Sequence, residues 1–308
     1  MRAFIFPGQG SQAVGMGAAL ADASRAAKDV FAEVDEALGQ NLFRLMRDGP
    51  DEELKLTENA QPAIMAHSIA VLRTMGVTLA GAASFVAGHS LGEYSALCAA
   101  GSFDLATTAK LLKLRGQAMQ QAVPVGEGAM AALLGADLAL AQKIAEAASE
   151  GEVCTVANDN DPSQVVISGQ KGAIDRAIAL AKDMVAKRAV PLPVSAPFHC
   201  PLMQPAAEAM SDALSYVVLE RPSVPLFANV TAQPESDPDT IRNQLVEQVT
   251  GMVRWRESVL NMFDAGVHEF VEVGGKVLGP MVKRIAPDAT VTSVVTIEDV
   301  EAMAKEIA

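Results

Sequence analysis

The chain has 308 residues, of which 50% are hydrophobic and 20% charged, and its formal net charge is −13 at pH 7. This composition is typical of a folded globular protein with a large core and excludes a disordered chain. The acidic balance argues against nucleic-acid binding, which needs a basic face. Apolar stretches are interrupted well before the roughly 20 residues that span a bilayer, and the run at residues 3–6 is too short for a secretion signal. We therefore expect a cytoplasmic protein with no membrane or nucleic-acid partner.

The first part of the chain alternates between predicted strands and helices. Residues 2–6 predict a strand that ends at Pro7-Gly8, and the Gly-rich stretch "GQGSQAVGMG" predicts a turn. Apolar residues at helical spacing then predict helices over residues 17–38, 60–76 and 104–121. Between the last two, "ASFVAG" predicts a strand and residues 91–100 a helix.

Residues 125–193 predict a separate unit with the order β-α-β-β-α-β, which is the ferredoxin-like order. Its segments are the strand "GAMAALLG", a helix capped by Asp137, the strand "EVCTVAN", the turn "NDNDP", the strand "QVVISG", a helix over 171–184 and the strand "AKRAVPLPV". We interpret this unit as a small domain inserted into a larger α/β domain formed by residues 1–124 and 194–308. "VPVGEG" and "LPVSAPF" are the predicted hinges.

The cysteines of the chain are far apart and form no CxxC pair. They are Cys98, Cys154 and Cys200. This spacing indicates neither a disulfide framework nor a zinc site, and we expect free thiols and no bound metal.

The stretch "FVAGHSLGEYSAL", residues 85–97, places Ser90 between a predicted strand and a predicted helix. Residues 88–92 fit the G-x-S-x-G pattern of a nucleophile elbow, in which small flanking residues permit a crowded turn. The helix N-terminus and the N–H that follows the serine can stabilise an oxyanion. Ser90 is therefore a candidate nucleophile, and the alternative is a loop serine that only caps the helix.

A nucleophilic serine needs a base, and the chain has four histidines. His67 within a predicted helix and His268 at the start of a late strand favour structural roles. His89 adjoins Ser90 on a tight turn, where neighbouring side chains point apart. His199 lies in the Pro-flanked loop "SAPFHCP", the kind of segment that often carries catalytic groups, and is the stronger candidate.

The Gly-rich turn after the first strand also permits a second interpretation, in which it binds a dinucleotide. Its G-x-G is not followed by x-x-G in register, and no clear acidic residue lies about 20 positions later. The pattern therefore argues against this reading.

Several motifs occur in one order along the chain: "FPGQGSQ" at 6–12, "GHSLGE" at 88–93, "LRGQAM" at 114–119, "NDNDPSQVVISG" at 158–169, "APFH" at 196–199 and "VEQVTGMVRW" at 246–255. Together they resemble the malonyl-CoA:acyl-carrier-protein transacylase family over essentially the whole chain. The resemblance implies an α/β-hydrolase-like large domain with a central, mostly parallel sheet and an inserted ferredoxin-like small domain. Gly275 stands where the family has proline, which predicts a looser turn.

The resemblance also implies the catalytic roles. Ser90 carries the acyl ester, and His199 acts first as general base and then as general acid. The main-chain carbonyl of Gln248 orients the imidazole in place of a triad carboxylate, which makes the pair a Ser–His dyad. The N–H groups of Gln9 and Leu91 form the oxyanion hole. Without the resemblance, Gln248 would be interpreted as a polar residue on a helix surface.

Two further residues concern the acyl group. A planar guanidinium binds a carboxylate in bidentate fashion, so the resemblance implies that Arg115 binds the malonyl carboxylate and disfavours acetyl. Spacing alone would favour solvent exposure of Arg115. In related acyltransferase domains a bulky aromatic residue before the base accompanies malonyl, because the ring fills the space of an α-methyl, a difference of about 1–3 kcal/mol. Phe198 holds that position, and a core phenylalanine is its alternative role.

The implied reaction is ping-pong transfer of malonyl from malonyl-CoA to the phosphopantetheine thiol of acyl carrier protein. CoA and the phosphopantetheine arm enter as substrates, and we expect no bound cofactor and a monomeric enzyme. Acidic carrier proteins require a local positive patch. The candidates for this patch are Lys187, Arg188, Lys276, Lys283 and Arg284. The alternatives are a serine esterase or thioesterase with the same elbow and a non-catalytic scaffold that binds the carrier.

Overall fold

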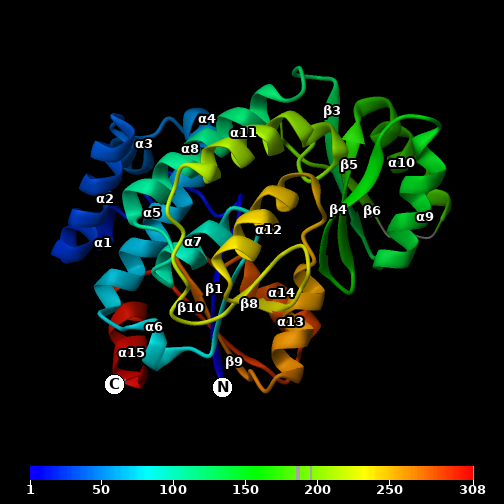
Figure 1. Cartoon of the computed structure of the whole chain (residues 1–308). Helices are drawn as coiled ribbons and strands as arrows, with labels where there is room; N and C mark the ends of the chain where they lie inside the picture. Colours follow the sequence, from blue (N-terminus) through cyan, green and yellow to red (C-terminus); the bar gives the residue numbers. More distant parts are fainter. Residues whose placement is uncertain (185–187, 195, 308) are drawn as a thin grey trace.

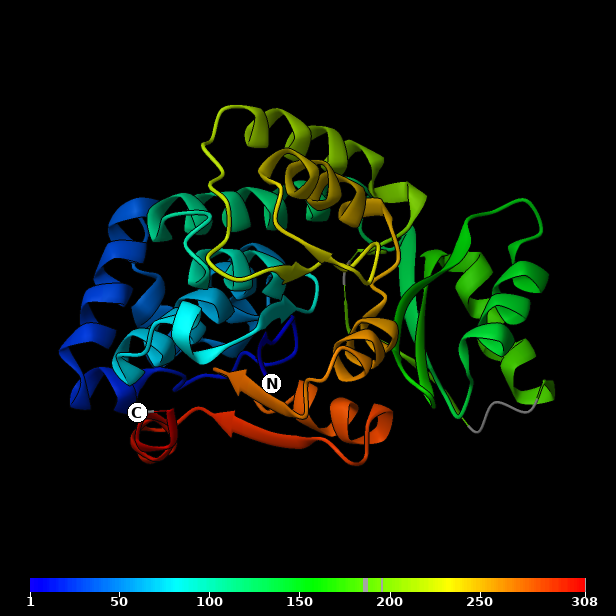
Figure 2. The ribbon, with the colours of Figure 1, turned by 60° about the horizontal axis from the view of Figure 1, so that its bottom comes forward.

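The computed structural model of the chain describes residues 1–184, 188–194 and 196–307. Within these residues it contains a six-stranded sheet and a separate four-stranded sheet, each with its own helices. Figures 1 and 2 show the four-stranded sheet and its two helices, in green, on one side of the larger part of the molecule. The structure is therefore mixed α/β, with a large part and a smaller part.

The six-stranded sheet is parallel except at one edge. Its order is β10 (Thr290–Val294), β9 (Glu269–Val273), β1 (Arg2–Phe6), β2 (Phe85–Gly88), β7 (Leu226–Phe227) and β8 (Pro234–Glu235), and only the pairing of β7 with β8 is antiparallel within the described residues. Phe6 pairs with Gly88, so the loops that follow β1 and β2 leave the sheet side by side. Ligand sites of parallel sheets lie at this carboxyl edge.

Helices cover both faces of this sheet, which explains why β1 is a continuous apolar run. Phe4 and Phe6 pack in the core on one face, whereas Ala3 and Ile5 pack in the core on the other, as the two-residue period of a strand requires. The Ala3 and Ile5 face is covered by α13 (Trp255–Asp264) and α14 (Leu278–Ile285). The opposite core includes α2 (Arg25–Leu38), α5 (Thr57–Met75), α7 (Gly92–Ala99), α8 (Leu105–Gln121), α11 (Gln204–Ser215), α12 (Pro238–Thr250) and α15 (Ile297–Ile307).

Shorter helices complete the large part. They are α1 (Ala18–Ala23), α3 (Leu42–Asp48), α4 (Asp51–Leu54), α6 (Leu79–Ala82) and a 3₁₀ turn at Pro201–Met203. In the described part of the chain, no helix combines the length and apolar character needed to cross a membrane.

The prediction of one helix over residues 17–38 was wrong, because the chain breaks at Ser24. Ser24 has extended backbone angles, φ −130° and ψ 124°, and its hydroxyl accepts a hydrogen bond from the N–H of Ala27 at 3.3 Å. Serine competes for backbone groups in this way and so favours helix caps over helix interiors. Two helices, α1 and α2, therefore replace the single predicted one.

The four-stranded sheet has the predicted element order. The elements are β3 (Gly128–Leu134), α9 (Leu138–Ser149), β4 (Cys154–Asp161), β5 (Gln164–Gln170), α10 (Lys171–Asp183) and β6 (Arg188–Pro191). The sheet is antiparallel with the order β4-β5-β3-β6. Asp137 caps α9 as predicted, accepting a hydrogen bond from the N–H of Leu140 at 2.8 Å.

The predicted turn at "NDNDP" was wrong for its first four residues, because residues 158–161 continue strand β4 with register shifts. Their polar side chains have partners in the large part of the molecule. Asp159 forms an ion pair with Arg256 at 2.8 Å, and Asp161 forms one with Arg284 at 2.7 Å. These contacts fasten the small sheet to helices α13 and α14. A local turn pattern gave no information about partners about 100 residues away.

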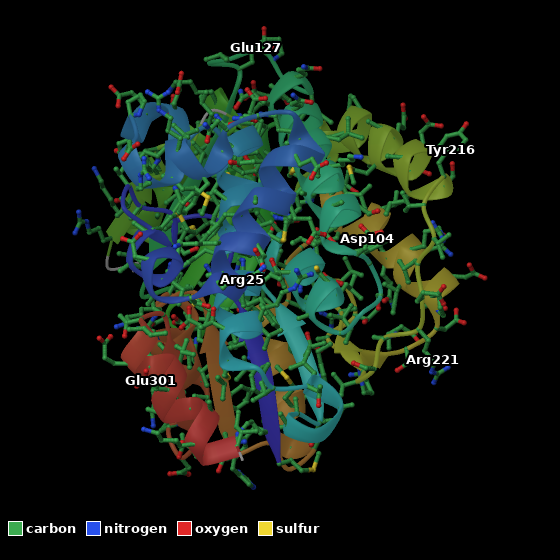
Figure 3. All side chains as sticks on the ribbon, turned by 90° about the vertical axis from the view of Figure 1, so that its left-hand side faces the viewer. Arg25, Asp104, Glu127, Tyr216, Arg221 and Glu301 are labelled. Carbon is green, nitrogen blue, oxygen red and sulfur yellow. The ribbon has the colours of Figure 1, made fainter. Side chains whose placement is uncertain are left out.

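The two ends of the chain lie at the same end of the large part (Figures 1 and 2). The guanidinium of Arg2 lies 3.0 Å from a carboxylate oxygen of Glu306, which ties β1 to α15. Figure 3 views the side of the molecule formed by α2 and α8, with Tyr216 and Glu127 at the periphery. Tyr216 is 82% exposed.

Candidate active site

Ser90 sits on a three-residue turn between β2, which ends at Gly88, and α7, which begins at Gly92. Its φ is 54°, a left-handed value that residues with side chains rarely adopt. A Cβ at Gly88 would collide with the carbonyl group of Gly92, and a Cβ at Gly92 would collide with the carbonyl oxygen of Phe6. The turn thus has the crowded backbone expected of a nucleophile elbow.

We expect Gly88→Ala to lower the free energy of unfolding by more than about 4 kcal/mol, since backbone must move to make room for the methyl group. Gly81→Ala on α6 is the matched control, because a Cβ there meets nothing closer than the Thr78 hydroxyl at 3.9 Å. Urea unfolding of both variants checks this. A Gly88→Ala protein as stable as the control would contradict the crowded-turn geometry.

Asn229, which sequence reasoning missed, holds the elbow in place. Its side-chain oxygen accepts a hydrogen bond from the N–H of Ser90 at 2.8 Å, and its side-chain nitrogen donates to the carbonyl of Gly88 at 2.7 Å. The residue lies just beyond β7, at the same carboxyl edge of the sheet as Ser90. The sequence feature from which Asn229 could have been predicted is its position as a polar residue directly after the apolar run "VPLFA".

Ser90 and His199 are 109 positions apart in the sequence and in direct contact in the structure. Ser90 Oγ lies 2.8 Å from His199 Nε2, and His199 Nδ1 lies 2.8 Å from the carbonyl oxygen of Gln248. Because a carbonyl can only accept, Nδ1 carries the proton and Nε2 is the free acceptor for the serine hydroxyl. The arrangement can therefore remove the serine proton without a carboxylate partner for the imidazole.

Burial and the positive charge of Arg115 lower the pKa of His199 from 6.5 to about 3. A neutral imidazole is the form that can accept a proton from the serine, and this environment favours the neutral form of His199 at neutral pH. In the unfolded chain the imidazole protonates first as the pH falls. The stability associated with the neutral form is thus complete above pH 6.5 and is lost as the pH drops toward 3.

We expect the imidazole of His199 to remain neutral between about pH 5 and pH 8, a range in which an ordinary histidine titrates. NMR of protein labelled with ¹³C-histidine measures this directly, and His199→Gln identifies the signal. A His199 resonance that titrates near pH 6.5 would contradict the prediction.

Arg115 lies on α8 and is only 1% exposed, so the expectation of a solvent-exposed side chain from spacing alone was wrong. Its guanidinium donates to the side-chain oxygens of Gln61 and Gln248, each at 2.8 Å, and to Ser90 Oγ at 3.1 Å. Burial lowers its pKa. Among the described residues its hydrogen-bond acceptors are uncharged, so the buried charge is available to an anionic substrate group.

Gln248 does more than orient the imidazole. It is fully buried on α12, which excludes the helix-surface interpretation. Its side-chain nitrogen donates to the carbonyl of Ser90 at 3.0 Å and to a carboxylate oxygen of Glu93 at 2.7 Å. Gln248 therefore contacts the nucleophile segment, the base and Arg115 together.

Gln9 and Leu91 are brought to Ser90 by the register of β1 and β2, since each follows its strand at the carboxyl edge. No hydrogen bond between described residues uses the backbone N–H of either one. The side chain of Gln9 accepts from the hydroxyl of Thr57 at 2.9 Å, which fixes the loop. Both residues line the same cavity as Ser90, where their free N–H groups can meet a developing oxyanion.

This cavity has a volume of about 450 Å³ and lies between the two parts of the molecule. Its polar lining includes Gln9, Ser90, Arg115 and His199. Its apolar wall comes from α8, β3 and the segment after β6 and includes Met119, Met130, Leu192 and Phe198. Phe198 is 9% exposed and lies next to the base in the chain. A cavity with apolar walls that contains a serine suits an acyl-thioester arm.

Two of the other histidines have hydrogen-bond partners away from the Ser90 hydroxyl, and the ring of His268 packs edge-on against Phe263 with centroids 4.8 Å apart. His89 is turned toward the small sheet, where its Nε2 lies 2.7 Å from the side-chain oxygen of Asn160. His67 is buried and its Nδ1 lies 3.2 Å from the carbonyl oxygen of Gly274. In the part of the chain that the structure describes, no cluster of His, Cys, Asp or Glu side chains is arranged to hold a metal ion.

Gly275, for which the resemblance predicts a looser turn, is buried. A Cβ at Gly275 would lie 2.7 Å from Pro7 Cγ, so the position packs against the loop that carries Gln9.

The candidate carrier-binding cations differ in their surroundings. Arg284 pairs with Asp161, and Lys283 donates to the carbonyl of Ala289, so both support the fold. Arg188 and Lys276 are exposed. Lys187 lies outside the described residues.

Comparison with known proteins agrees with the resemblance in the motifs. The family described as "Acyl transferase domain" matches residues 3–284. The malonyl CoA-acyl carrier protein transacylase of Escherichia coli (strain K12) is 46% identical over 292 residues, which cover 94% of each chain. The acyl-carrier-protein S-malonyltransferase of Bartonella henselae is 51% identical in sequence, and its crystal structure superposes with a TM-score of 0.97 over 99% of each chain.

A third relative was solved in complex with a carrier. It is the malonyl-transacylase bound to a type II PKS acyl-carrier protein, and it is 40% identical with a TM-score of 0.96 over 99% of each chain. Family model, sequence relatives and solved structures all cover nearly the same residues. The chain therefore belongs to the malonyl CoA-acyl carrier protein transacylase family of acyltransferases.

Proposed function

We propose that this enzyme transfers the malonyl group of malonyl-CoA to the phosphopantetheine thiol of acyl carrier protein through an ester on Ser90. One observation carries the proposal: Ser90 Oγ lies 2.8 Å from His199 Nε2 and 3.1 Å from a guanidinium nitrogen of Arg115. A nucleophile, its base and a group that binds carboxylates thus meet at one atom. The activities for which the relatives are named support the same conclusion.

In the first half-reaction, the malonyl carboxylate binds Arg115 and the thioester carbonyl faces Ser90. The serine oxygen attacks this carbonyl while its proton passes to His199 Nε2. The N–H groups of Gln9 and Leu91 stabilise the tetrahedral oxyanion. When the C–S bond breaks, the imidazolium returns the proton to the CoA sulfur, and malonyl remains on the serine.

The second half-reaction reverses these steps with a different thiol. The phosphopantetheine thiol of the carrier protein enters the cavity and loses its proton to His199. Its sulfur attacks the ester carbonyl, and the proton then returns to Ser90 Oγ. The low pKa of His199 means that the proton is held only briefly, because the imidazolium is costly in this buried site.

The site favours malonyl over uncharged acyl groups because only malonyl supplies an anion for the buried guanidinium of Arg115. Phe198 lines the cavity beside His199 and leaves less space for a substituent on the α-carbon. We assign to Phe198 a modest preference for malonyl over methylmalonyl, since one methyl group is worth about 1–3 kcal/mol.

The partners follow from the chemistry. Both acyl donor and acceptor present the same phosphopantetheine arm, and the exposed cations Arg188 and Lys276 are candidates to meet an acidic carrier. The enzyme acts as a monomer without a bound cofactor. The free thiols Cys98, Cys154 and Cys200 are consistent with a reducing compartment, and we assign the enzyme to the cytoplasm.

We also assign the two parts of the molecule to two domains. Residues 125–193 form an inserted ferredoxin-like domain, supported by the element order and by the antiparallel strand order β4-β5-β3-β6. Residues 1–124 and 194–308 form the discontinuous α/β-hydrolase-like domain, supported by the parallel sheet and the serine elbow.

The decisive experiment follows malonyl-CoA with and without a holo acyl carrier protein. We expect a stable acyl-enzyme detected by intact mass in the absence of carrier, and rapid formation of malonyl-carrier in its presence. Fast release of free malonate without transfer would favour the esterase or thioesterase alternative. Absence of any acyl-enzyme would favour the non-catalytic scaffold.

A further inference from the structure

Glu93 is a buried carboxylate that the reaction steps above do not use. It lies in the first turn of α7, three residues after the nucleophile, and is 1% exposed. Burying a carboxylate is costly unless specific donors meet it. Two donors do so, because one oxygen of Glu93 accepts from the side-chain nitrogen of Gln248 at 2.7 Å and from the backbone N–H of Asn229 at 3.3 Å. Both donors belong to residues that shape the site.

The side-chain amide of Gln248 has two unlike sides, and its surroundings determine which way it points. Its nitrogen faces acceptors: the carboxylate of Glu93, the carbonyl of Ser90 and, at 3.4 Å, the side-chain oxygen of Asn229. Its oxygen faces the guanidinium of Arg115, which can only donate. A flipped amide would set N–H against N–H at Arg115 and leave the carboxylate without its shortest contact.

We infer that Glu93 is a positioning residue for substrate selection: it holds the Gln248 amide in the orientation that presents an oxygen to Arg115 and so keeps the guanidinium beside Ser90. The chain of contacts runs from Glu93 to Gln248 at 2.7 Å, from Gln248 to Arg115 at 2.8 Å and from Arg115 to Ser90 Oγ at 3.1 Å. Glu93 itself touches no substrate atom in this scheme. The inference rests on the proposed function, since it concerns how malonyl is chosen.

Burial raises the pKa of Glu93 to about 7, so the carboxyl and the carboxylate are both present near neutral pH. The contact to Gln248 persists in either form, because a proton on one oxygen leaves the other oxygen free to accept. The hydrogen bond, and not the full negative charge, is therefore the element that positions the amide. This distinction makes the role testable with substitutions that separate charge from geometry.

The experiment measures kcat/KM for acylation of the enzyme by malonyl-CoA and by acetyl-CoA, and takes their ratio. Loss of the amide orientation disturbs Arg115, on which only malonyl depends, so we expect Glu93→Ala to lower the malonyl-to-acetyl ratio by about tenfold or more. Glu93→Asp keeps the charge but withdraws the acceptor from Gln248, and we expect a lower ratio there as well. If Glu93→Ala does not fold, the malonyl-to-acetyl ratio of Glu93→Asp tests the inference instead.

Glu93→Gln provides the rescue, because its amide oxygen can still accept from Gln248 and Asn229. We expect its ratio to stay within about threefold of the wild-type ratio. Glu272→Gln is the matched control: Glu272 is also a fully buried glutamate, and it accepts from the backbone N–H groups of residues 277–279, away from the site. It should lower the thermal unfolding temperature and leave the ratio unchanged.

An unchanged ratio in Glu93→Asp, or a Glu93→Gln protein as impaired as Glu93→Ala, would overturn the inference. Equal loss of malonyl and acetyl acylation would also overturn it, because that pattern indicates a general structural role. Failure of the proposed function gives a different result: the wild-type enzyme would then form no malonyl-enzyme, or would show no preference for malonyl over acetyl.

Discussion

Ser90→Ala is expected to abolish the malonyl-enzyme and to lower the rate of transfer by about 10⁴-fold or more, as removal of a nucleophile does in serine enzymes. The hydroxyl is the atom at which the base and Arg115 meet, at 2.8 Å and 3.1 Å. The variant should fold normally, because alanine removes one oxygen from a side chain that is only partly buried. Intact mass spectrometry after incubation with malonyl-CoA measures the loss.

Ser95→Ala is the matched control for this substitution. Ser95 lies on α7, is fully buried, and its hydroxyl has no hydrogen-bond partner among the described residues. Its removal should leave the acyl-enzyme intact. A malonyl adduct on the Ser90→Ala protein, located by peptide mapping at another residue, would refute the assignment of the nucleophile.

Arg115→Ala is expected to lower acylation by malonyl-CoA by about 10²- to 10³-fold, within the cost of truncating one member of a buried charged contact. Acylation by acetyl-CoA should fall far less, since acetyl has no carboxylate for the guanidinium to bind. The preference for malonyl should therefore disappear. Arg115→Lys should restore little, because an ammonium group cannot reach Gln61, Gln248 and the substrate in the fixed geometry of a guanidinium.

Lys113→Ala tests whether any cation of α8 would have the same effect. Lys113 is half-buried on the same helix and pairs with Glu58 at 3.1 Å, and neither residue is among those that line the cavity around Ser90. We expect this variant to retain the preference for malonyl. Intact-mass time courses with malonyl-, methylmalonyl- and acetyl-CoA compare the variants directly, and an Arg115→Ala enzyme that still prefers malonyl would refute the carboxylate-binding role.

The local features of this protein could be predicted from the sequence because they depend on neighbouring residues. The strand–turn–helix around Ser90, the cap at Asp137 and the β-α-β-β-α-β order of the small part all appear in the structure. The spaced motifs also indicated the family before any geometry was available, and the comparisons confirm it. Each of these predictions depends either on short-range backbone preferences or on the order and spacing of motifs along the chain.

Secondary-structure predictions from local sequence patterns were wrong where a polar side chain could form more than one kind of contact. Ser24 ends one helix and caps the next, although the apolar spacing continues through it. Residues 158–161 have the composition of a turn, yet they extend β4 because Arg256, Arg284 and His89 meet their side chains. In both cases the competing hydrogen bond or ion pair decided the outcome.

The site depends on contacts between segments that the sequence does not relate. Parallel pairing of β1 with β2 brings Gln9 to Ser90, and the positions of α8 and α12 bring Arg115 to the hydroxyl of Ser90 and Gln248 to its main-chain carbonyl. Glu93 ends the motif "GHSLGE" and Asn229 lies outside the quoted motifs, and neither position in the sequence indicates the contacts that the side chain makes. By itself the sequence determined the family, the element order of the small part and the elbow, since these follow from residue type and spacing. Only the tertiary structure decided which buried polar groups satisfy one another, because hydrogen bonds across 100 or more residues exist only once the sheet and helices have packed.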